Sequence, residues 1–312
     1  MVKTIVLLLF TLIVVPVFTV YFDHHSMSPE QLNLLMESGG IALALALAAF
    51  VISTITGNCS QVDKMWSIVP AVYAWHIVLS ADFVPQAAQP RLVLMALLVT
   101  AWSIRLSYNF SRRGGYTWKF WTGEEDYRWE VLRQRPELSG KWQWMAFNLF
   151  FISLYQMGLI WLFTMPIMVA ATGDAPMNWL DYAAIFITIF LLIIETVADQ
   201  QQWDYQQEKH RMKREGIPLT GKYALGFTHT GLWRISRHPN YFAEQAIWVV
   251  FYFFSVAATD RWLNWSVAGA LLLVILFKGS ADFSEGISLE KYPGYRDYVK
   301  STPRFIPNPF KK

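Results

Sequence analysis

Residues Thr228–Ala258 read THTGLWRISRHPNYFAEQAIWVVFYFFSVAA, in which a polar and cationic approach passes directly into a long apolar run. Pro239 lacks a backbone N–H and has a fixed φ, which suits the first turn of a helix, so we predict that a helix begins close to His238. Asn240 and Glu244 then lie one turn apart on the same helical face. Apolar runs with a basic flank are typical of transmembrane helices. This stretch therefore predicts a membrane fold with polar groups at one end of a spanning helix.

The composition of the whole chain agrees with a membrane protein. Of the 312 residues, 54% are hydrophobic and only 16% are charged, with long stretches that carry no charge. We predict an all-α, polytopic membrane helix bundle of about eight transmembrane helices that forms a single integral membrane domain over residues 1–312. The predicted spans are Thr4–Phe22, Gly40–Thr56, Met65–Ser80, Leu92–Phe110, Met145–Ala170, Trp179–Ala198, Tyr241–Ala258 and Trp262–Phe277.

The distribution of Lys and Arg residues tests the predicted number of spans. With eight alternating spans and a cytoplasmic N-terminus, 24 of the 26 Lys and Arg residues fall on the cytoplasmic side, and only Arg91 and Arg261 fall outside. The positive-inside rule predicts such a split. We therefore expect a multi-pass integral membrane protein (of the inner membrane, if bacterial), with both termini and any site for a charged ligand facing the cytoplasm.

Several chemistries have no signal in the sequence. The lone Cys59 excludes an intramolecular disulfide and a cysteine metal cluster, and the six His residues show no HExxH spacing, so we predict no metal site. No P-loop, GxSxG or GxGxxG motif occurs. We expect no nucleic-acid partner, because acids are interleaved with the basic residues, and no obligatory protein partner is evident.

Two predicted helix ends near the cytoplasm carry polar faces. Arg105, Asn109 and Arg112 are spaced to share one helical face, and so are Glu195 and Asp199. Ionisable groups in or near spans are candidate functional residues. The structural alternatives are that Arg105 extends to the lipid headgroups and that Glu195 only pairs with a neighbouring helix.

The helix start near Pro239 is flanked by Arg234, Arg237 and His238, and a helix N-terminus with such neighbours favours anions. The simpler alternative is the basic flank of an ordinary span.

Three motifs of the chain resemble those of a known family. GLWRISRHPNYFAEQ, with VADQQQWDY upstream and LEKYPGYRDYVKSTPRFIP downstream, resembles the C-terminal domain of the steroid 5α-reductase family. The chain from about Asp63 onward is similar to the family's bacterial multispanning relatives, which share the basic helix end at Arg105 and the GEEDYR segment, Gly123–Arg128. RHPNYF alone is less specific, because sterol reductases and isoprenylcysteine-type methyltransferases carry similar elements.

The resemblance implies a reductase-like region over residues 60–312 that uses NADPH to reduce an activated, enone-type C=C bond of a steroid-like or other lipid entering from the bilayer. It places Asn240 and Glu244 near the nicotinamide and ribose, Asp199 near the adenine-side nucleotide, and Arg112 and Arg113 near the phosphates. Further cofactor-binding candidates are Arg105, Asn109, Glu195, Arg234, Arg237, His238, Tyr241 and Asp282.

The family has a tyrosine that polarises the substrate carbonyl, and this chain has Trp102 at that position. Tryptophan cannot serve as the proton donor. Trp203 and Gln206 also replace arginines that follow the family's acid. Our candidates for the missing acid are Asp63, which burial could keep protonated, and Tyr108, with Glu244 as a third catalytic candidate. Asp63 could instead form an ion pair with Lys64 or Arg105, or cap a helix.

Two other functions stay open from the sequence. An S-adenosylmethionine-dependent membrane methyltransferase of the isoprenylcysteine type could use the same helix start, with acids for the amino-acid moiety of its cofactor. A non-enzymatic transporter or assembly factor is the third reading, although no pair of broken helices favours transport.

Overall fold

The structure is a computed structural model that describes residues 2–310, with side chains from residue 6 onward, and every regular element in that range is a helix. The chain divides into two compact units, each described by itself below. The first unit holds the chain up to Ile185 together with Trp248–Leu273, and the second holds Phe186–Ile247 together with the chain from Val274 onward.

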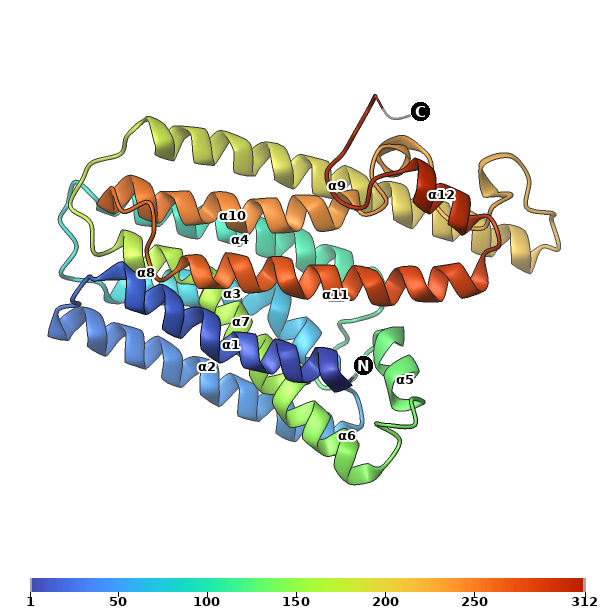
Figure 1. Cartoon of the computed structure of the whole chain (residues 1–312), viewed down its shortest axis with the longest axis horizontal. Coiled ribbons are helices and arrows are strands. Elements are labelled where there is room, and N and C mark those ends of the chain that lie inside the picture. Colours follow the sequence, from blue (N-terminus) through green and yellow to red (C-terminus); the bar gives the residue numbers. More distant parts are fainter. Residues whose placement is uncertain (1, 311–312) are drawn as a thin grey trace. The chain divides into compact units, whose positions relative to one another are not determined.

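The predicted fold class is confirmed. Seven described helical segments are long and apolar enough to cross a membrane (Figure 1). They are α1 (Val2–Asp23), α2 (Pro29–Thr56), α4 (Gln89–Ser111), the run Lys141–Ala170, α9 (Trp179–Arg214), α10 (Pro239–Thr259) and α11 (Val267–Lys291).

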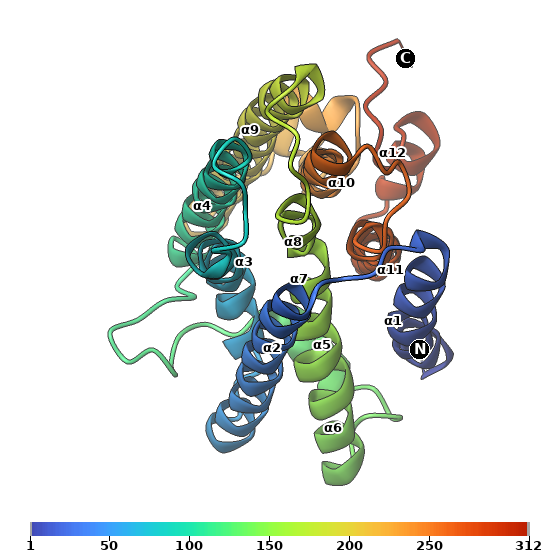
Figure 2. The same cartoon turned by 90° about the vertical axis from the view of Figure 1, so that its left-hand side faces the viewer.

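The remaining predicted span, Met65–Ser80, lies in α3 (Gln61–Ser80), which is outside this set of seven. This helix nevertheless runs antiparallel beside α4, where the Trp75 indole N–H donates to Thr100 Oγ1 at 2.9 Å (Figure 2). Its polar residues make it less apolar than the other seven. Buried contacts with α2, α4 and α7 compensate, so α3 carries the chain from one end of the first unit to the other.

Several helix ends differ from the sequence prediction. The helix α2 begins eleven residues before Gly40, because Ser28 and Gln31 form a capping box at its N-terminus. The helix α11 starts at Val267 and continues to Lys291, well past the predicted end at Phe277. The apolar runs therefore located the spans, and local capping set their ends.

The run Lys141–Ala170 is composite. It consists of α6 (Lys141–Phe147), the π-helix η1 (Asn148–Tyr155), α7 (Gln156–Thr164) and α8 (Pro166–Ala170). In η1, the Asn148 amide donates to Ser53 Oγ on α2 at 2.9 Å, a buried contact that ties the two helices together. Pro166 begins α8, where its missing N–H costs no hydrogen bond.

The second unit has a small core of its own. Besides its parts of α9, α10 and α11, it contains η2 (Gly221–Tyr223), η3 (Gly231–Arg234) and α12 (Tyr295–Ser301). Phe227 packs edge-on against Tyr295 with ring centroids 5.0 Å apart, and Tyr298 completes the buried cluster. This core fixes the loop that leads to α10.

Candidate functional site

The loop before α10 is held against α9 by polar contacts. The Trp233 indole donates to the carbonyl of Ala198 at 3.1 Å, and the amide of Leu232 donates to Gln201 Oε1 at 2.9 Å. Gly231 adopts a φ of +64°, and a Cβ there would lie 2.6 Å from Gln201 Oε1, so only glycine fits. The loop thus reaches the start of α10 in a fixed conformation.

Carboxylates gather where α9 passes the start of α10. The Asn240 amide donates to Asp199 Oδ1 at 3.1 Å, which joins the two predicted faces. Asp199, Glu195 and Glu244 are all buried, with exposed fractions of 6%, 4% and 5%. Carboxylate oxygens accept hydrogen bonds, so this cluster, which we call the carboxylate site, has the chemistry to accept from hydroxyl, amide or ammonium donors.

Arg237 and His238 lie in a buried ionic network centred on Glu285 of α11. Glu285 Oε1 accepts from Arg237 Nε at 2.8 Å and lies 2.8 Å from His238 Nε2. The Arg237 guanidinium also donates to the carbonyls of Val299 and Thr302. These donors are therefore used within the second unit, where they fix the start of α10 to α11 and α12.

The chain after α12 pairs with this network. The amides of Arg237 and His238 donate to the carbonyls of Pro303 and Arg304 at 2.9 and 3.0 Å. Arg304 binds Asp282 and Glu285, so the predicted cofactor residue Asp282 is half-exposed and lies in an ion pair. Burial opposes the charged form of Arg304, but its bonds to both acids outweigh burial and raise its pKa.

Two further predicted residues flank the carboxylate site in sequence. Arg234 is exposed and makes no hydrogen bond or ion pair with any described residue, so its guanidinium is available to an anion. Tyr241 stacks on His238 with ring centroids 5.1 Å apart and packs edge-on against Phe277. Tyr241 thus serves packing in the second unit.

The predicted basic face of α4 belongs to the first unit. Arg112 donates through Nε to Asn109 Oδ1 at 2.9 Å, as the spacing predicted, and the guanidinium lies 5.6 Å from the centre of the Tyr108 ring. Tyr108 itself is 65% exposed, and Arg113 is exposed at the helix end. Arg105 is half-buried one turn before Asn109.

Asp63 contacts neither of the cations weighed for it from the sequence in any hydrogen bond that the structure describes. Its Oδ2 accepts from the indole of Trp129 in α5 (Tyr127–Arg133) at 3.0 Å. Asp126 caps α5, where burial opposes its ionisation but Arg128 outweighs that effect and lowers the pKa of Asp126. Asp63 thus anchors α5 to the first turn of α3.

Lys64 provides a second anchor beside Asp63. Its fully buried ammonium donates to the carbonyls of Phe120 and Thr122 at 2.5 and 2.6 Å. Nearby, Glu125 accepts from the amide of Cys59 at 2.6 Å and pairs with Arg133. The GEEDYR segment is thereby fixed to the start of α3.

The sequence marks Glu285 as an ionisable group near a predicted span, but nothing local marks it as the centre of a network 48 residues from Arg237. Sequence reasoning missed two residues altogether. Tyr73 on α3 and Ser103 on α4 are buried with hydroxyl groups that contact no hydrogen-bond partner among the described residues. The Trp75–Thr100 bond lies two residues after Tyr73 on α3 and three residues before Ser103 on α4.

The chain matches a family model over residues 49–302, described as "Protein of unknown function (DUF1295)". The chain belongs to this family. It is similar to the "Uncharacterized protein C594.04c" of Schizosaccharomyces pombe, with 40% identity over 264 residues that cover 82% of this chain and 74% of the relative. No solved structure matches the chain. The matched region of this DUF1295 chain includes the carboxylate site, the Glu285 network and the α3–α5 anchors.

Proposed function

We propose that the protein is a membrane-embedded, NADPH-dependent reductase of an activated C=C bond in a lipid. The observation that carries the proposal is the carboxylate site, in which Asn240 of α10 donates to Asp199 of α9, with the buried acids Glu195 and Glu244 one turn away on the same two helices. Acids are costly to bury, and neither an uncharged polar cluster nor a plain basic flank accounts for three buried acids at this position.

The residues of the carboxylate site fit the nucleoside parts of NADPH. Asp199 and Glu195 can accept from ribose hydroxyls, and Glu244 and Asn240 can bind a carboxamide, which needs one acceptor and one donor. Arg234, whose guanidinium is available, suits a phosphate, and Arg112 and Arg113 are the phosphate-binding candidates on α4. Arg237 and His238 would act indirectly, by holding the start of α10 in place.

The cofactor, when bound, would supply the hydride, so the protein must orient the two reactants and stabilise charge on the substrate oxygen. Tyr73 is the donor we favour for that oxygen, ahead of Asp63 and the exposed Tyr108. Its phenol is buried and has no hydrogen-bond partner among residues 6–310, and burial of such a group costs about 1–3 kcal/mol unless a ligand satisfies it. Asp63 is held by Trp129 in a structural contact.

The direct test is ligand binding to the detergent-purified full chain, followed as thermal stabilisation by NADPH, NADH and S-adenosylmethionine. A ligand at a hundredfold excess over its Kd stabilises the folded state by about 2.7 kcal/mol. We expect stabilisation by NADPH and its loss in Asn240→Ala and Glu244→Gln. Asp204→Asn is the matched control, because Asp204 is an exposed acid on the same helix as Asp199.

Reduction is then tested with enone lipids as consumption of NADPH coupled to loss of the enone. In Tyr73→Phe, turnover should fall at least tenfold while stabilisation by NADPH is unchanged. Full turnover in Tyr73→Phe would show that the Tyr73 hydroxyl takes no part in the reaction.

A methyltransferase is the second candidate, because three buried acids also suit the ammonium group of S-adenosylmethionine. Stabilisation by S-adenosylmethionine, with no response to either nicotinamide cofactor, would replace the reductase with this candidate.

A further inference from the structure

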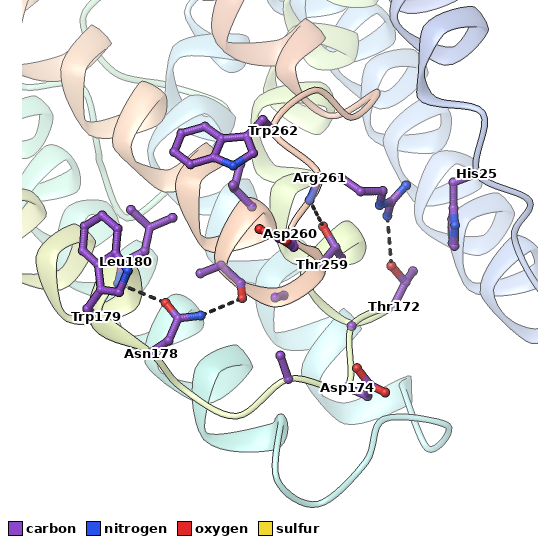
Figure 3. Close-up of a pocket in the computed structure, with 15 residues that line it drawn as sticks. His25, Thr172, Asp174, Asn178, Trp179, Leu180, Thr259, Asp260, Arg261 and Trp262 are labelled. Atoms are coloured by element: carbon purple, nitrogen blue, oxygen red, sulfur yellow. Dashed lines mark hydrogen bonds between the residues drawn. The ribbon is translucent and has the colours of Figure 1, made fainter.

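An open pocket of about 590 Å³ lies at the end of the first unit where α1, α8 and α10 finish. It is lined by the chain after α1, by the connection between α8 and α9, and by the connection between α10 and α11 (Figure 3). The charge pattern of the sequence assigns this end to the side opposite the cytoplasm. The pocket is separate in sequence from the carboxylate site and does not depend on the reductase proposal.

Buried contacts hold the lining segments of the pocket. The fully buried Arg91 donates to both oxygens of Asp181 at 2.7 and 2.8 Å and to the carbonyl of the lining residue Ala175 at 2.8 Å. Gly173 lies so close to Ala258 that a Cβ would be 2.1 Å from the Ala258 carbonyl oxygen. These contacts join two of the three lining segments, so the pocket exists before any ligand binds.

The pocket carries more negative than positive charge. Asp174 and Asp260 are exposed, and neither makes an ion pair or a side-chain hydrogen bond with a described residue. Arg261 donates to Asp23 at 2.6 Å and to Thr172 Oγ1 at 3.4 Å. A guanidinium has five N–H donors, so three of those of Arg261 are available to a further acceptor.

Two tryptophans complete the lining. Trp179 and Trp262 are 72% and 65% exposed, on different lining segments (Figure 3). Tryptophan is enriched at the level of the lipid headgroups, and its ring attracts ammonium groups. The two carboxylates attract a cation, and the two aromatic rings favour an organic ammonium group.

We propose that this pocket binds the phosphoethanolamine headgroup of a membrane phospholipid. The primary ammonium group would donate to Asp174 or Asp260, and the phosphate would accept from Arg261. A primary ammonium can donate three hydrogen bonds to carboxylates, whereas the quaternary ammonium of a choline headgroup can donate none. The tryptophan rings attract both headgroups, so the two carboxylates are what favours phosphatidylethanolamine over phosphatidylcholine.

The test is competition for bound lipid in the full chain, purified in mild detergent and measured by native mass spectrometry. Equal amounts of phosphatidylethanolamine and phosphatidylcholine are added, and the ratio of the two bound lipids is read. Loss of a charge-assisted contact corresponds to about a tenfold change in binding, so we expect about tenfold preference for phosphatidylethanolamine.

The double variant Asp174→Asn, Asp260→Asn should reduce this preference to twofold or less. Both acids are exposed, so the variant should fold, and an unchanged unfolding temperature checks this. The matched control is Asp82→Asn, which removes an exposed acid outside the pocket lining and should leave the preference unchanged. Equal binding of the two lipids by the native chain, or a preference that survives the double variant, would overturn the proposal.

A second arm separates a membrane lipid from a soluble amine. Glycerophosphoethanolamine carries the same headgroup without acyl chains and is added at the concentration of the lipid. Failure to compete supports the lipid as the ligand, since the acyl chains then contribute to binding. Equal competition by the soluble compound would contradict the assignment to a membrane phospholipid.

Discussion

The ion pair between Arg91 and Asp181 offers the sharpest test of what holds the first unit together. Both side chains have no exposed surface, and Arg91 also donates to the carbonyls of Ala175 and Pro176 at 2.8 and 2.9 Å. The perturbations are Arg91→Met, Asp181→Leu and the double variant, which replace the charges with apolar groups of similar size.

The expected loss in the free energy of unfolding depends on which buried charge is left without its partner. Removing one partner of a buried pair leaves the other charge uncompensated and costs about 3–5 kcal/mol. The double variant leaves no charge, and only the carbonyls without their donor and the Asn178 N–H without its acceptor. We therefore expect its cost to fall short of the sum of the two single variants by about 3 kcal/mol.

The chain supplies its own reporter for this measurement. Cys59 is the single cysteine, lies in the same unit and is 1% exposed, so a thiol-reactive fluorogenic dye reports unfolding during heating in detergent. For a domain of this size, 3–5 kcal/mol corresponds to a decrease in Tm of roughly 6–20 °C for each single variant. The control Arg135→Met removes an exposed arginine of the same unit and should change the free energy of unfolding by less than about 0.5 kcal/mol.

Two results would refute the reasoning. Single variants with the Tm of the native chain would mean that the pair is open to water. A double variant whose loss equals the sum of the single losses would mean that the two charges do not interact in the folded protein.

Two further predictions concern the loop around Cys59 and the Glu285 network. Burial raises the pKa of Cys59 from 9.0 to about 12, so its thiolate at neutral pH is about 1,000-fold scarcer than that of an ordinary thiol, and its alkylation should accelerate with pH up to about pH 12. Arg133 donates to Cys59 Sγ and lowers the pKa of Cys59, so Arg133→Met should raise this pKa further and slow alkylation at pH 8; an unchanged rate would show that Arg133 does not act on the thiol. Glu285→Gln leaves the buried Arg237 without its counter-charge and should cost about 3 kcal/mol, measured as faster proteolysis of the C-terminal segment. The exposed Glu290 gives the control Glu290→Gln, and equal proteolysis of both variants would contradict the structural role of Glu285.

The membrane fold could be predicted because transfer of apolar side chains into a bilayer is a local quantity that adds up along the chain. It located the seven described segments that are apolar enough to span a membrane, and the eighth predicted span lies in the helix α3, which is outside that set. The helix start at Pro239 was equally predictable, since a missing N–H acts within one turn.

The faces of single helices could also be read from the sequence. The spacing of Arg112 from Asn109 and the polar start of α10 required only helical geometry, and the structure contains the contacts that this spacing allows. Functional roles for these residues stay predictions, which the binding experiments address.

Contacts between distant segments were decided by the tertiary structure alone. The sequence placed Arg237 and His238 where an anion could bind, but the fold brings Glu285 and the chain after α12 against them. It likewise gave Asp63 the indole of Trp129 as its partner. A charge is stabilised by whichever partner lies within hydrogen-bond distance after folding, whereas hydropathy depends only on the residue itself. The sequence therefore determined that the chain enters the membrane and where its helices run, and the packing of those helices decided which polar groups remain available to a ligand.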